Sequence, residues 1–583
     1  MKRIAVVKKD KCLPAKCANL CMKLCPINRT GEDCISLIDG KAAVKEELCT
    51  GCGICQNRCP FEAIHIINLP EQLSGSPVHQ YGRNGFQLYS LPTPMFGKVV
   101  GIIGPNGIGK STALKVIAGL LVPNLGDIKK EETDIQSVLE FFKGTEAQSF
   151  FEKLRDGEIK VSYKLQSVDL IPDQFKGTVR DLLVRADQKG SFDKIVEALD
   201  LKKILDTEIS SISGGELQRV AIAATVLKKA NLYIFDEPSS YLDIKQRILV
   251  SNFIKSLATP DVAVLVVEHD LIIFDYITDL VHIMYGKEGC FGVVSQTKTS
   301  KAGINTFLSG YLKEENIRFR DSEIRFGASR PAIDENALHL TGWKNLKKIF
   351  SRFELIAKTG ELKRNEVVGV LGENGIGKTT FVKILAGLIE KDSGDVTEKV
   401  AVSYKPQYLK PSDELVMNVL KEALERYESQ LIKPLNITPL LDKRLDELSG
   451  GQLQRVAIAA CLSKDADLYL MDEPSAYLDI EQRLKISKII RDVVEKREIS
   501  ALIVDHDLLF IDYLSHKVTI FFGEPAIKGE VKGPFAMAEG MNDFLESLDI
   551  TMRRDQESNR PRVNKKESQM DQVQRKENRR YYQ

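Results

Sequence analysis

Two phosphate-binding loops of the same form occur in this chain. The first is Gly104–Thr112, with the sequence GPNGIGKST, and the second is Gly372–Thr380, with the sequence GENGIGKTT. Glycines in such loops let backbone N–H groups surround phosphate oxygens, and the helix that begins after the loop adds positive potential. Lys110 and Lys378 are placed to reach the β- and γ-phosphates. These residues predict the binding and hydrolysis of ATP.

Each loop is followed by side chains suited to Mg²⁺ binding and to the activation of water. An apolar run ends in Asp236–Glu237 in the first half and in Asp472–Glu473 in the second. The aspartates are expected to hold Mg²⁺ through water, and the glutamates to polarise the attacking water. Gln166 and Gln407 follow strand-like Ser-Tyr-Lys runs and are expected to sense Mg²⁺ and that water. The residues predicted to bind Mg²⁺ are Ser111, Gln166, Asp236, Thr379, Gln407 and Asp472.

A histidine and a glycine signature complete each set of motifs. His269 and His506 end apolar runs and are predicted catalytic switches, although a lone histidine is more often structural. The Ser-Gly-Gly signatures begin at Ser213 and Ser449, which are 236 residues apart, and the two Asp-Glu pairs have the same separation. A repeated order at a fixed separation indicates an internal duplication. The predicted catalytic residues are Glu237, His269, Glu473 and His506.

Eight cysteines near the amino terminus predict two iron–sulfur clusters. The run Cys49–Pro60 has the C-x2-C-x2-C-x3-C-P spacing of two-cluster ferredoxins, in which the fourth cysteine ligates the other cluster. The earlier group, Cys12–Pro26, is more widely spaced than the ferredoxin norm. A pair of zinc sites is the alternative, and Cys34 is not expected to be a ligand. The predicted ligands of one 4Fe–4S cluster are Cys12, Cys17, Cys21 and Cys59, and those of the other are Cys25, Cys49, Cys52 and Cys55.

Predicted strands and helices place these side chains where the chemistry needs them. Val99–Ile103 is a short apolar strand that enters the first loop, and Ala113–Ala118 follows the loop as a helix. This strand–loop–helix order distinguishes a phosphate loop from a chance match. Leu232–Phe235 and Leu468–Met471 are apolar runs typical of buried strands, and each delivers an Asp-Glu pair.

Composition limits the class of protein. The chain has 583 residues, enough for three or four domains, and its 82 basic and 81 acidic residues nearly cancel. No uninterrupted apolar stretch is long enough to cross a membrane, and the amino terminus lacks the apolar core of a signal peptide. Eleven cysteines without a secretory signal indicate a reducing compartment, where clustered cysteines usually bind metal. A cytoplasmic protein without a membrane partner is expected.

The order of glycine loop, glutamine, Ser-Gly-Gly signature, Asp-Glu pair, Tyr-Leu-Asp loop and histidine resembles that of the ATP-binding-cassette ATPases. In that family two cassettes face head to tail, and each signature caps the nucleotide held by the opposite loop. The resemblance implies a clamp that closes on ATP and opens after hydrolysis. The implied contacts of the first site are Asn106, Gly107, Gly109, Lys110, Ser111, Thr112 and Gln166, with Ser449, Gly451 and Asp479 from the second half. Those of the second site are Asn374, Gly375, Gly377, Lys378, Thr379, Thr380 and Gln407, with Ser213, Gly215 and Asp243 from the first half.

With its cysteine-rich start, the whole chain resembles the RNase L inhibitor family of ribosome-recycling ATPases, found in archaea and eukaryotes, and an archaeal source is expected. The first half has an insertion in which Asp134–Phe142 and Glu146–Leu154 are predicted amphipathic helices, and Tyr311–Arg330 and Phe544–Arg554 resemble hinges. The implied fold is α/β, with two tandem cassette P-loop NTPase domains arranged head to tail after a ferredoxin-like α+β domain. The implied ranges are 1–72 for the ferredoxin-like domain, 73–310 for the first nucleotide-binding domain with its helix–loop–helix insert at about 129–157, 311–332 for hinge 1, 333–535 for the second nucleotide-binding domain, and 536–583 for hinge 2 and a basic, mobile tail.

The resemblance implies that the protein splits ribosomes. It would bind the ribosome, chiefly the small subunit and its rRNA, beside a release factor or Pelota, with initiation factors as further partners. ATP closure would swing the iron–sulfur domain against that factor, and the monomer, an intramolecular cassette dimer, would stay on the small subunit until hydrolysis. A soluble cassette ATPase in iron–sulfur assembly or electron transfer is the alternative. The predicted rRNA contacts in hinge 1 are Lys313, Arg318, Arg320, Arg325 and Arg330.

Aromatic residues that would stack on adenine are the least specific part of the prediction. Trp343 precedes the second loop at roughly the distance where cassettes place an aromatic residue. Tyr81 is the predicted counterpart in the first half, and Phe86 is the alternative. A buried core aromatic is the competing interpretation.

Overall fold

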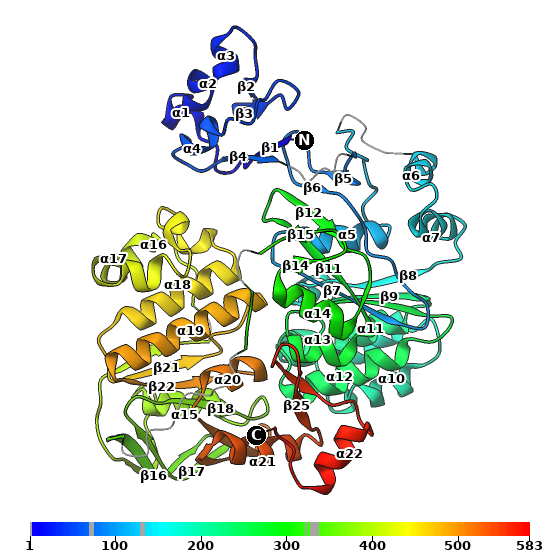
Figure 1. The fold of residues 1–583 in the computed structure, drawn as a ribbon. Helices are drawn as coiled ribbons and strands as arrows, with labels where there is room; N and C mark the ends of the chain where they lie inside the picture. Colours follow the sequence, from blue (N-terminus) through cyan, green and yellow to red (C-terminus); the bar gives the residue numbers. More distant parts are fainter. Residues whose placement is uncertain are drawn as a thin grey trace.

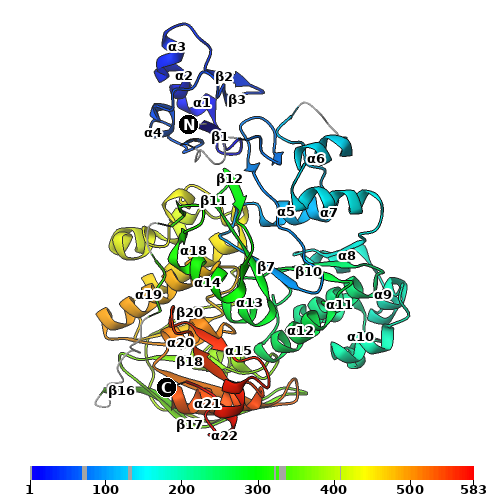
Figure 2. The same cartoon turned by 45° about the vertical axis from the view of Figure 1, so that its right-hand side comes forward.

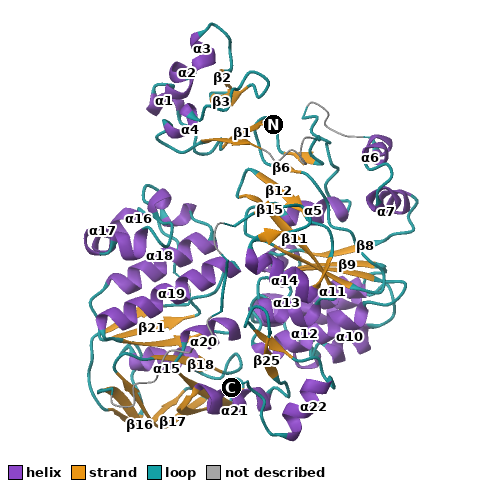
Figure 3. Ribbon diagram, in the orientation of Figure 1, coloured by secondary structure: helices purple, strands orange, loops and turns teal. Residues whose placement is uncertain are grey.

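The computed structural model describes residues 3–68, 75–128, 134–320, 323–326, 337–407 and 409–582. A small amino-terminal domain lies above two larger α/β bodies that stand side by side (Figure 1). Turning the molecule by 45° keeps the small domain over one end of the pair (Figure 2). Strands gather inside each large body, and helices cover them (Figure 3).

The amino-terminal domain is small and has mixed secondary structure. Strand β1 (Arg3–Val7) pairs antiparallel with β4 (Ile64–Asn68), and β2 (Ile35–Ile38) pairs with β3 (Lys41–Val44). Its apolar core contains few large side chains, and several of its buried residues are cysteines. Such a core supplies little stability without metal. Its helices are α1 (Pro14–Cys17), α2 (Leu20–Leu24), α3 (Pro26–Arg29) and α4 (Ile54–Asn57).

The first large body is built on a sheet with the strand order β5-β6-β12-β11-β7-β10-β9-β8. Its central strands β11, β7, β10, β9 and β8 are parallel, and β7, β9 and β10 are buried along their whole length. Apolar runs of this kind form parallel strands covered by helices on both faces. The strands are β5 (His79–Gln80), β6 (Gln87–Leu88), β7 (Val99–Ile103), β8 (Val161–Lys164), β9 (Leu232–Asp236), β10 (Ala263–Val267), β11 (Leu280–Lys287), β12 (Phe291–Val294) and β13 (Lys298–Thr299). The helices are α5 (Lys110–Ile117), α8 (Ile171–Gln174), α9 (Val179–Ala186), α10 (Phe192–Ala198), α11 (Gly214–Leu227), α12 (Ile244–Leu257), α13 (Leu271–Ile277) and α14 (Ser300–Ser309).

The second large body repeats this plan with the strand order β19-β16-β17-β24-β23-β18-β22-β21-β20. Strand β18 stands where β7 stands in the first body, and β21 and β22 repeat β9 and β10. The strands are β16 (His339–Ile349), β17 (Glu354–Lys363), β18 (Val367–Leu371), β19 (Ser393–Val396), β20 (Val402–Lys405), β21 (Leu468–Asp472), β22 (Ser500–Val504), β23 (Lys517–Glu524) and β24 (Lys528–Ala536). The helices are α15 (Lys378–Leu385), α16 (Val416–Val419), α17 (Lys421–Arg426), α18 (Gly450–Ser463), α19 (Ile480–Arg497), α20 (Leu508–Leu514) and α21 (Met537–Ser547).

The insertion in the first half forms the two helices that the sequence predicts. Helix α6 covers Ile135–Phe141 and helix α7 covers Glu146–Arg155, and both lie at the outer side of the first body (Figure 1). The rings of Phe142 and Phe151 stack with their centres 5.3 Å apart and hold the helices together. The start of the predicted insert, 129–133, lies outside the described residues.

The tail was predicted to be mobile, and this prediction is wrong. The residues after α21 form β25 (Met552–Arg554), β26 (Pro561–Val563) and α22 (Gln569–Lys576). Arg560 is fully buried and donates to Asp275 of the first body, while the hydroxyl of Tyr582 donates to Asp512 of the second. Polar composition failed as a guide here because these side chains find charged and hydrogen-bonded partners on both large bodies.

Candidate functional site

The predicted motifs of both halves meet at one cavity of about 1280 Å³ between the two large bodies. Each phosphate loop lines it together with the signature of the other half. It therefore contains two composite sites, each built from both halves. The predicted residues that line it are Tyr81, Asn106, Gly107, Gly109, Lys110, Ser111, Thr112, Gln166, Ser213, Gly215, Asp236, Glu237, His269, Asn374, Gly375, Gly377, Lys378, Thr379, Thr380, Gln407, Ser449, Gly451, Asp472, Glu473 and His506.

The two phosphate loops have the backbone that phosphate binding requires. Gly109 and Gly377 begin helices α5 and α15 with φ values of 90° and 95°, which favour glycine. Lys110 Nζ donates to the carbonyls of Gly104 and Pro105 at 2.8 Å, and Lys378 makes the matching contacts in the second loop. Burial lowers the pKa of both lysines to about 8. Phosphate oxygens would relieve the cost of burying these charges.

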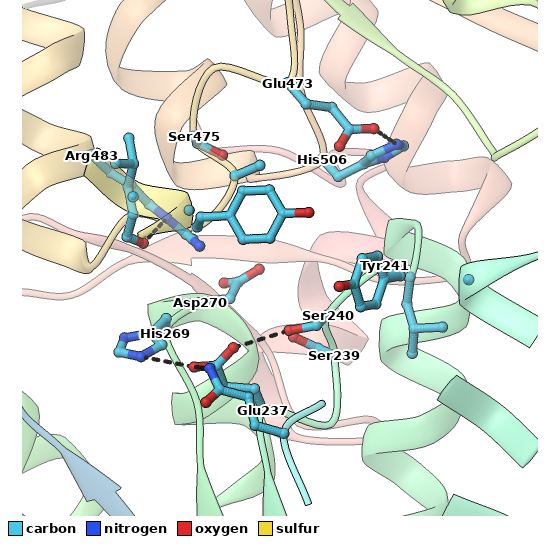
Figure 4. Close-up of a pocket in the computed structure, with 18 of the residues that line it drawn as sticks. Glu237, Ser239, Ser240, Tyr241, His269, Asp270, Glu473, Ser475, Arg483 and His506 are labelled. Atoms are coloured by element: carbon cyan, nitrogen blue, oxygen red, sulfur yellow. Dashed lines mark hydrogen bonds and ion pairs between the residues drawn. The ribbon is translucent and has the colours of Figure 1, made fainter. Parts of the chain in front are cut away.

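Glu237 is held on both carboxylate oxygens. Its Oε1 accepts from Gln166 Nε2 at 2.7 Å and lies 3.3 Å from His269 Nε2, and its Oε2 accepts from Ser240 Oγ at 3.2 Å (Figure 4). Burial alone would raise the pKa of Glu237, but the contact with His269 and the charge of Lys110 lower it to about 2. The carboxylate is therefore ionised and oriented.

Glu473 has a similar position and a different environment. Its Oε1 accepts from Gln407 Nε2 at 2.8 Å and lies 3.6 Å from His506 Nε2. Burial, followed by the charges of Asp472 and Asp505, raises the pKa of Glu473. Since the corresponding pKa in the first half is lowered, the two sites are electrostatically unequal.

Several buried polar atoms fit a bound nucleotide and Mg²⁺. Asp472 Oδ2 accepts from Thr379 Oγ1 at 2.7 Å, whereas its buried Oδ1 has no hydrogen-bond partner. In the first half Ser111 Oγ donates to Asp236 at 3.1 Å. The ring nitrogens of His269 and His506 are also buried and make no hydrogen bond, although each Nε2 lies near its glutamate, at 3.3 and 3.6 Å. Such atoms usually have a partner, and phosphate oxygens and hydrated Mg²⁺ are suitable ones here.

The signatures and the Tyr-Leu-Asp loops reach across to the opposite half. Ser213 and Ser449 cap helices α11 and α18, so the helix starts face the cavity. Asp243 caps α12 and also accepts from the backbone N–H of Asn374, at 2.9 Å. Asp479 caps α19 and lies close enough to Lys110 for its charge to raise the pKa of that lysine, against the effect of burial. The head-to-tail arrangement implied by the sequence is therefore present.

The adenine-stacking prediction is wrong for Trp343. This side chain is 1 % exposed and packs edge-on against Phe381 in the core, so it cannot stack on a nucleotide. Phe353, which the sequence analysis missed, lines the cavity instead. A side-chain carbon on Gly377 would lie 2.8 Å from its ring, as one on Gly109 would lie 2.5 Å from Phe86. The matching position of the two phenylalanines before β6 and β17 is the signal that could have identified it.

Tyr81 is placed as the sequence predicts. Its side chain is 47 % exposed, lines the cavity, and has its hydroxyl 3.3 Å from Thr112 Oγ1. Phe86, the alternative, lines the same part of the cavity. Either ring is accessible to a base.

The cysteines gather in the two predicted sets. Cys25, Cys49, Cys52 and Cys55 line one small cavity, and Cys34 lies beside them. Cys21 belongs to the second set. Its pKa is raised to about 11, first by burial and then by the other three members of that set, Cys12, Cys17 and Cys59. Backbone N–H groups of Ala42 and Ala63 already point at the sulfurs of Cys12 and Cys59.

These arrangements fit iron–sulfur clusters, in which four thiolates surround a cage and backbone N–H groups donate to sulfur. No group of three or more Cys, His, Asp or Glu in the described part of the chain is placed to hold a single metal ion.

Not all of the basic residues of hinge 1 that were predicted to contact rRNA are exposed. Arg320, a predicted rRNA contact, is buried: it donates to the carbonyl of Phe307 and pairs with Glu481 of the second body at 3.3 Å. That prediction is wrong, because the guanidinium links the halves of the protein. Lys313, Arg318 and Arg325 are exposed, and Arg330 lies outside the described residues.

Within the described residues, no helix is long and apolar enough to cross a membrane.

Family models match three parts of the chain. An "ABC transporter" model matches residues 95–240 and 358–476. A "Possible Fer4-like domain in RNase L inhibitor, RLI" matches 3–33, and a "4Fe-4S binding domain" matches 42–65.

Similar proteins match most or all of the chain. An uncharacterized ABC transporter ATP-binding protein of Methanocaldococcus jannaschii is 50 % identical over 100 % of this chain and 97 % of its own length. Translation initiation factor RLI1 of Saccharomyces cerevisiae is 42 % identical over 98 % of this chain and 97 % of its own. Among solved structures, ribosome-bound archaeal ABCE1, from a model with Pelota, matches with a TM-score of 0.94 and 49 % identity over 100 % of this chain and 99 % of that one. An archaeal ribosome recycling factor in complex with the ribosomal stalk protein aP1 matches with a TM-score of 0.83 and 48 % identity over 87 % and 99 %.

Proposed function

Because the chain belongs to the RNase L inhibitor family, and is therefore an ATP-binding-cassette ATPase with a 4Fe–4S domain, we propose that it is a cytoplasmic, ATP-driven ribosome recycling factor. It binds whole ribosomes after termination or rescue, splits them, and stays on the small subunit until ATP is hydrolysed. The observation that carries this proposal is the full-length similarity to ABCE1 in its ribosome-bound form.

ATP acts as a charged bridge between the two halves. In each composite site the lysine of one half and the signature helix of the other face the same part of the cavity. A triphosphate bound there attracts both, so binding closes the halves, and loss of the γ-phosphate removes that attraction. The glutamates Glu237 and Glu473 act as general bases that accept the proton of the attacking water, and His269 and His506 contact the γ-phosphate.

Two resident cofactors complete the protein. Mg²⁺, when bound, neutralises charge on the β- and γ-phosphates, and the residues that hold it are Ser111, Gln166, Asp236, Thr379, Gln407 and Asp472. Two 4Fe–4S clusters, when bound, cross-link the small domain through the two cysteine sets. Their role is structural, because the domain has little apolar core of its own.

One hairpin joins the nucleotide cavity to the iron–sulfur domain. Asn84, in the turn between β5 and β6, donates from Nδ2 to the carbonyl of Val44 at 3.1 Å and accepts the Val44 N–H on Oδ1 at 2.9 Å. The same turn carries Tyr81 and Phe86, which line the nucleotide cavity. A movement of this turn on nucleotide binding is therefore passed to the iron–sulfur domain, which pushes on a release factor or Pelota.

The ribosome is contacted through exposed basic residues. Lys313, Arg318 and Arg325 project from hinge 1 and suit phosphate groups of rRNA. Initiation factors are further partners on the small subunit. No second copy of the chain is needed, because both cassettes of the dimer are in one molecule.

Sedimentation tests the proposal against a role in iron–sulfur assembly. The full-length protein is mixed with ribosomal subunits and a non-hydrolysable ATP analogue, and fractions of a sucrose gradient are probed for it. Migration with the small subunit is expected. If the protein stayed at the top of the gradient and transferred iron and sulfide to an apo-acceptor, the assembly function would replace this proposal.

A further inference from the structure

We propose that Ser240 is a positioning residue for ATP hydrolysis in the first site, and that the second site lacks this function because Ala476 occupies the equivalent position. Each residue follows its glutamate by three positions, in Glu237-Pro-Ser-Ser240 and Glu473-Pro-Ser-Ala476. The inference rests on the proposed role of Glu237 and Glu473 as general bases.

The hydroxyl of Ser240 contacts the carboxylate oxygen that Gln166 and His269 leave free, and no other described side chain donates a hydrogen bond to it. Ser240 Oγ donates to Glu237 Oε2 at 3.2 Å, while Gln166 and His269 both approach Oε1 (Figure 4). Ser240 therefore fixes the rotation of the carboxylate independently of the other two side chains. A hydrogen bond to a charged acceptor is among the stronger ones that a serine can make.

The second site has a loop with matching backbone angles but lacks the hydroxyl. Glu237 and Glu473 both have positive φ values, 49° and 47°, and Tyr241 and Tyr477, one residue after Ser240 and Ala476, have 66° and 63°. The two loops thus present position 240 and position 476 in the same way. Gln407 and His506 approach Glu473 Oε1 at 2.8 and 3.6 Å, as in the first site, but the methyl group of Ala476 cannot donate to Oε2.

The difference matters when a nucleotide is bound. Gln166 is proposed to turn toward Mg²⁺ and the attacking water, and Glu237 Oε1 must then face that water. Ser240 keeps Oε2 in place while Gln166 turns away, so the carboxylate of Glu237 stays oriented toward the attacking water. In the second site the departure of Gln407 leaves only His506 to orient Glu473. The two sites therefore differ in how well the base is positioned, and not in which residue is the base.

Reciprocal substitutions test the role of the hydroxyl. S240A is made in an E473Q background, in which only the first site turns over, and A476S is made in an E237Q background. For S240A we expect kcat to fall about three- to tenfold with the KM for ATP changed less than about twofold, because the hydroxyl acts on the base and not on the nucleotide. S240T, which keeps the hydroxyl, should restore most of the rate. A476S should raise the kcat of the second site.

Each outcome decides one part of the inference. An unchanged kcat in S240A, or a fall that S240T does not rescue, would overturn the positioning role. An unchanged kcat in A476S would overturn the claim that Ala476 is what the second site lacks. The E237Q/E473Q double variant separates this from the underlying proposal: if it hydrolyses ATP at the wild-type rate, the glutamates are not the bases, whereas an inactive double variant with a normal S240A refutes Ser240 alone.

Discussion

Replacing Asp275 with alanine should release the carboxy-terminal tail from the first cassette. Asp275 accepts from Arg560 Nη1 at 2.9 Å and from Arg562 Nη2 at 3.0 Å, and the side chains of Arg560 and Asp275 are 0 % and 4 % exposed. The substitution removes the ion-pair partner of the fully buried Arg560, while Arg562 keeps its contact with Asp555 at 3.3 Å.

The magnitude follows from the burial of these charges. Removing one partner of a buried ion pair typically costs about 3–5 kcal/mol, because the remaining charge is uncompensated. Since each 1.4 kcal/mol is a factor of ten, the docking equilibrium of the tail should shift by roughly 140- to 3,700-fold toward release.

Limited trypsin digestion measures this shift. Cleavage within 551–582 reports the open population when docking is fast relative to cleavage, so the cleavage rate should rise steeply in D275A. Q556A is the matched control, because Gln556 lies on the tail with its side chain exposed and its replacement leaves every trypsin site in place, so it should digest as the wild type does. If D275A and Q556A were equally resistant, the tail would not be held by this buried pair.

Three further outcomes are expected. E237Q and E473Q should each slow turnover by about a hundredfold or more at the altered site. Because Glu237 and Glu473 have different neighbours, the two substitutions should have unequal effects on overall turnover and on ribosome splitting. Equal, independent halving of activity by each substitution would contradict this. Anaerobically purified protein should contain about eight iron atoms per chain, with broad absorbance near 400 nm that reduction bleaches; stoichiometric zinc without sulfide would contradict the assignment of clusters. Although burial opposes ionisation, hydrogen bonds from Ser558 and Glu557 lower the pKa of Asp555 to about 2. At pH values above 3.8, the ordinary pKa of this carboxyl group, the ionised Asp555 stabilises the docked tail. This contribution is lost as the pH falls toward 2. Hydrogen exchange in α22, corrected for intrinsic rates, should therefore accelerate between about pH 4 and 2, and less so in D555N.

Local motifs made most of the catalytic site predictable from the sequence. The phosphate loops, the Asp-Glu pairs and the signatures carry their chemistry within a few consecutive residues, and strand and helix positions fix where they point. The cysteine spacing likewise predicted which sulfurs gather, including the exchange of Cys25 and Cys59 between sets. In these cases short-range geometry determines function.

The errors arose where the partner lies far along the chain. Trp343 and Phe353 are both aromatic residues upstream of the second loop, and only packing against Phe381 or Gly377 tells them apart. Arg320 is on a basic hinge, yet it forms an ion pair with Glu481 of the second cassette. The tail has a polar composition, but Arg560 is buried by a contact with Asp275, 285 positions earlier in the chain. Composition and local sequence do not reveal contacts between residues that lie so far apart in the chain.

Splitting of whole ribosomes tests the central claim most directly. Archaeal ribosomes are incubated with the holoprotein, ATP and a Pelota-type factor, and the ratio of whole ribosomes to subunits is followed on sucrose gradients, with the E237Q/E473Q double variant run in parallel. The account predicts that whole ribosomes disappear only when ATP and the protein are both present, and that the double variant remains bound to the small subunit. Whole ribosomes that persist unchanged at saturating ATP and holoprotein would contradict it.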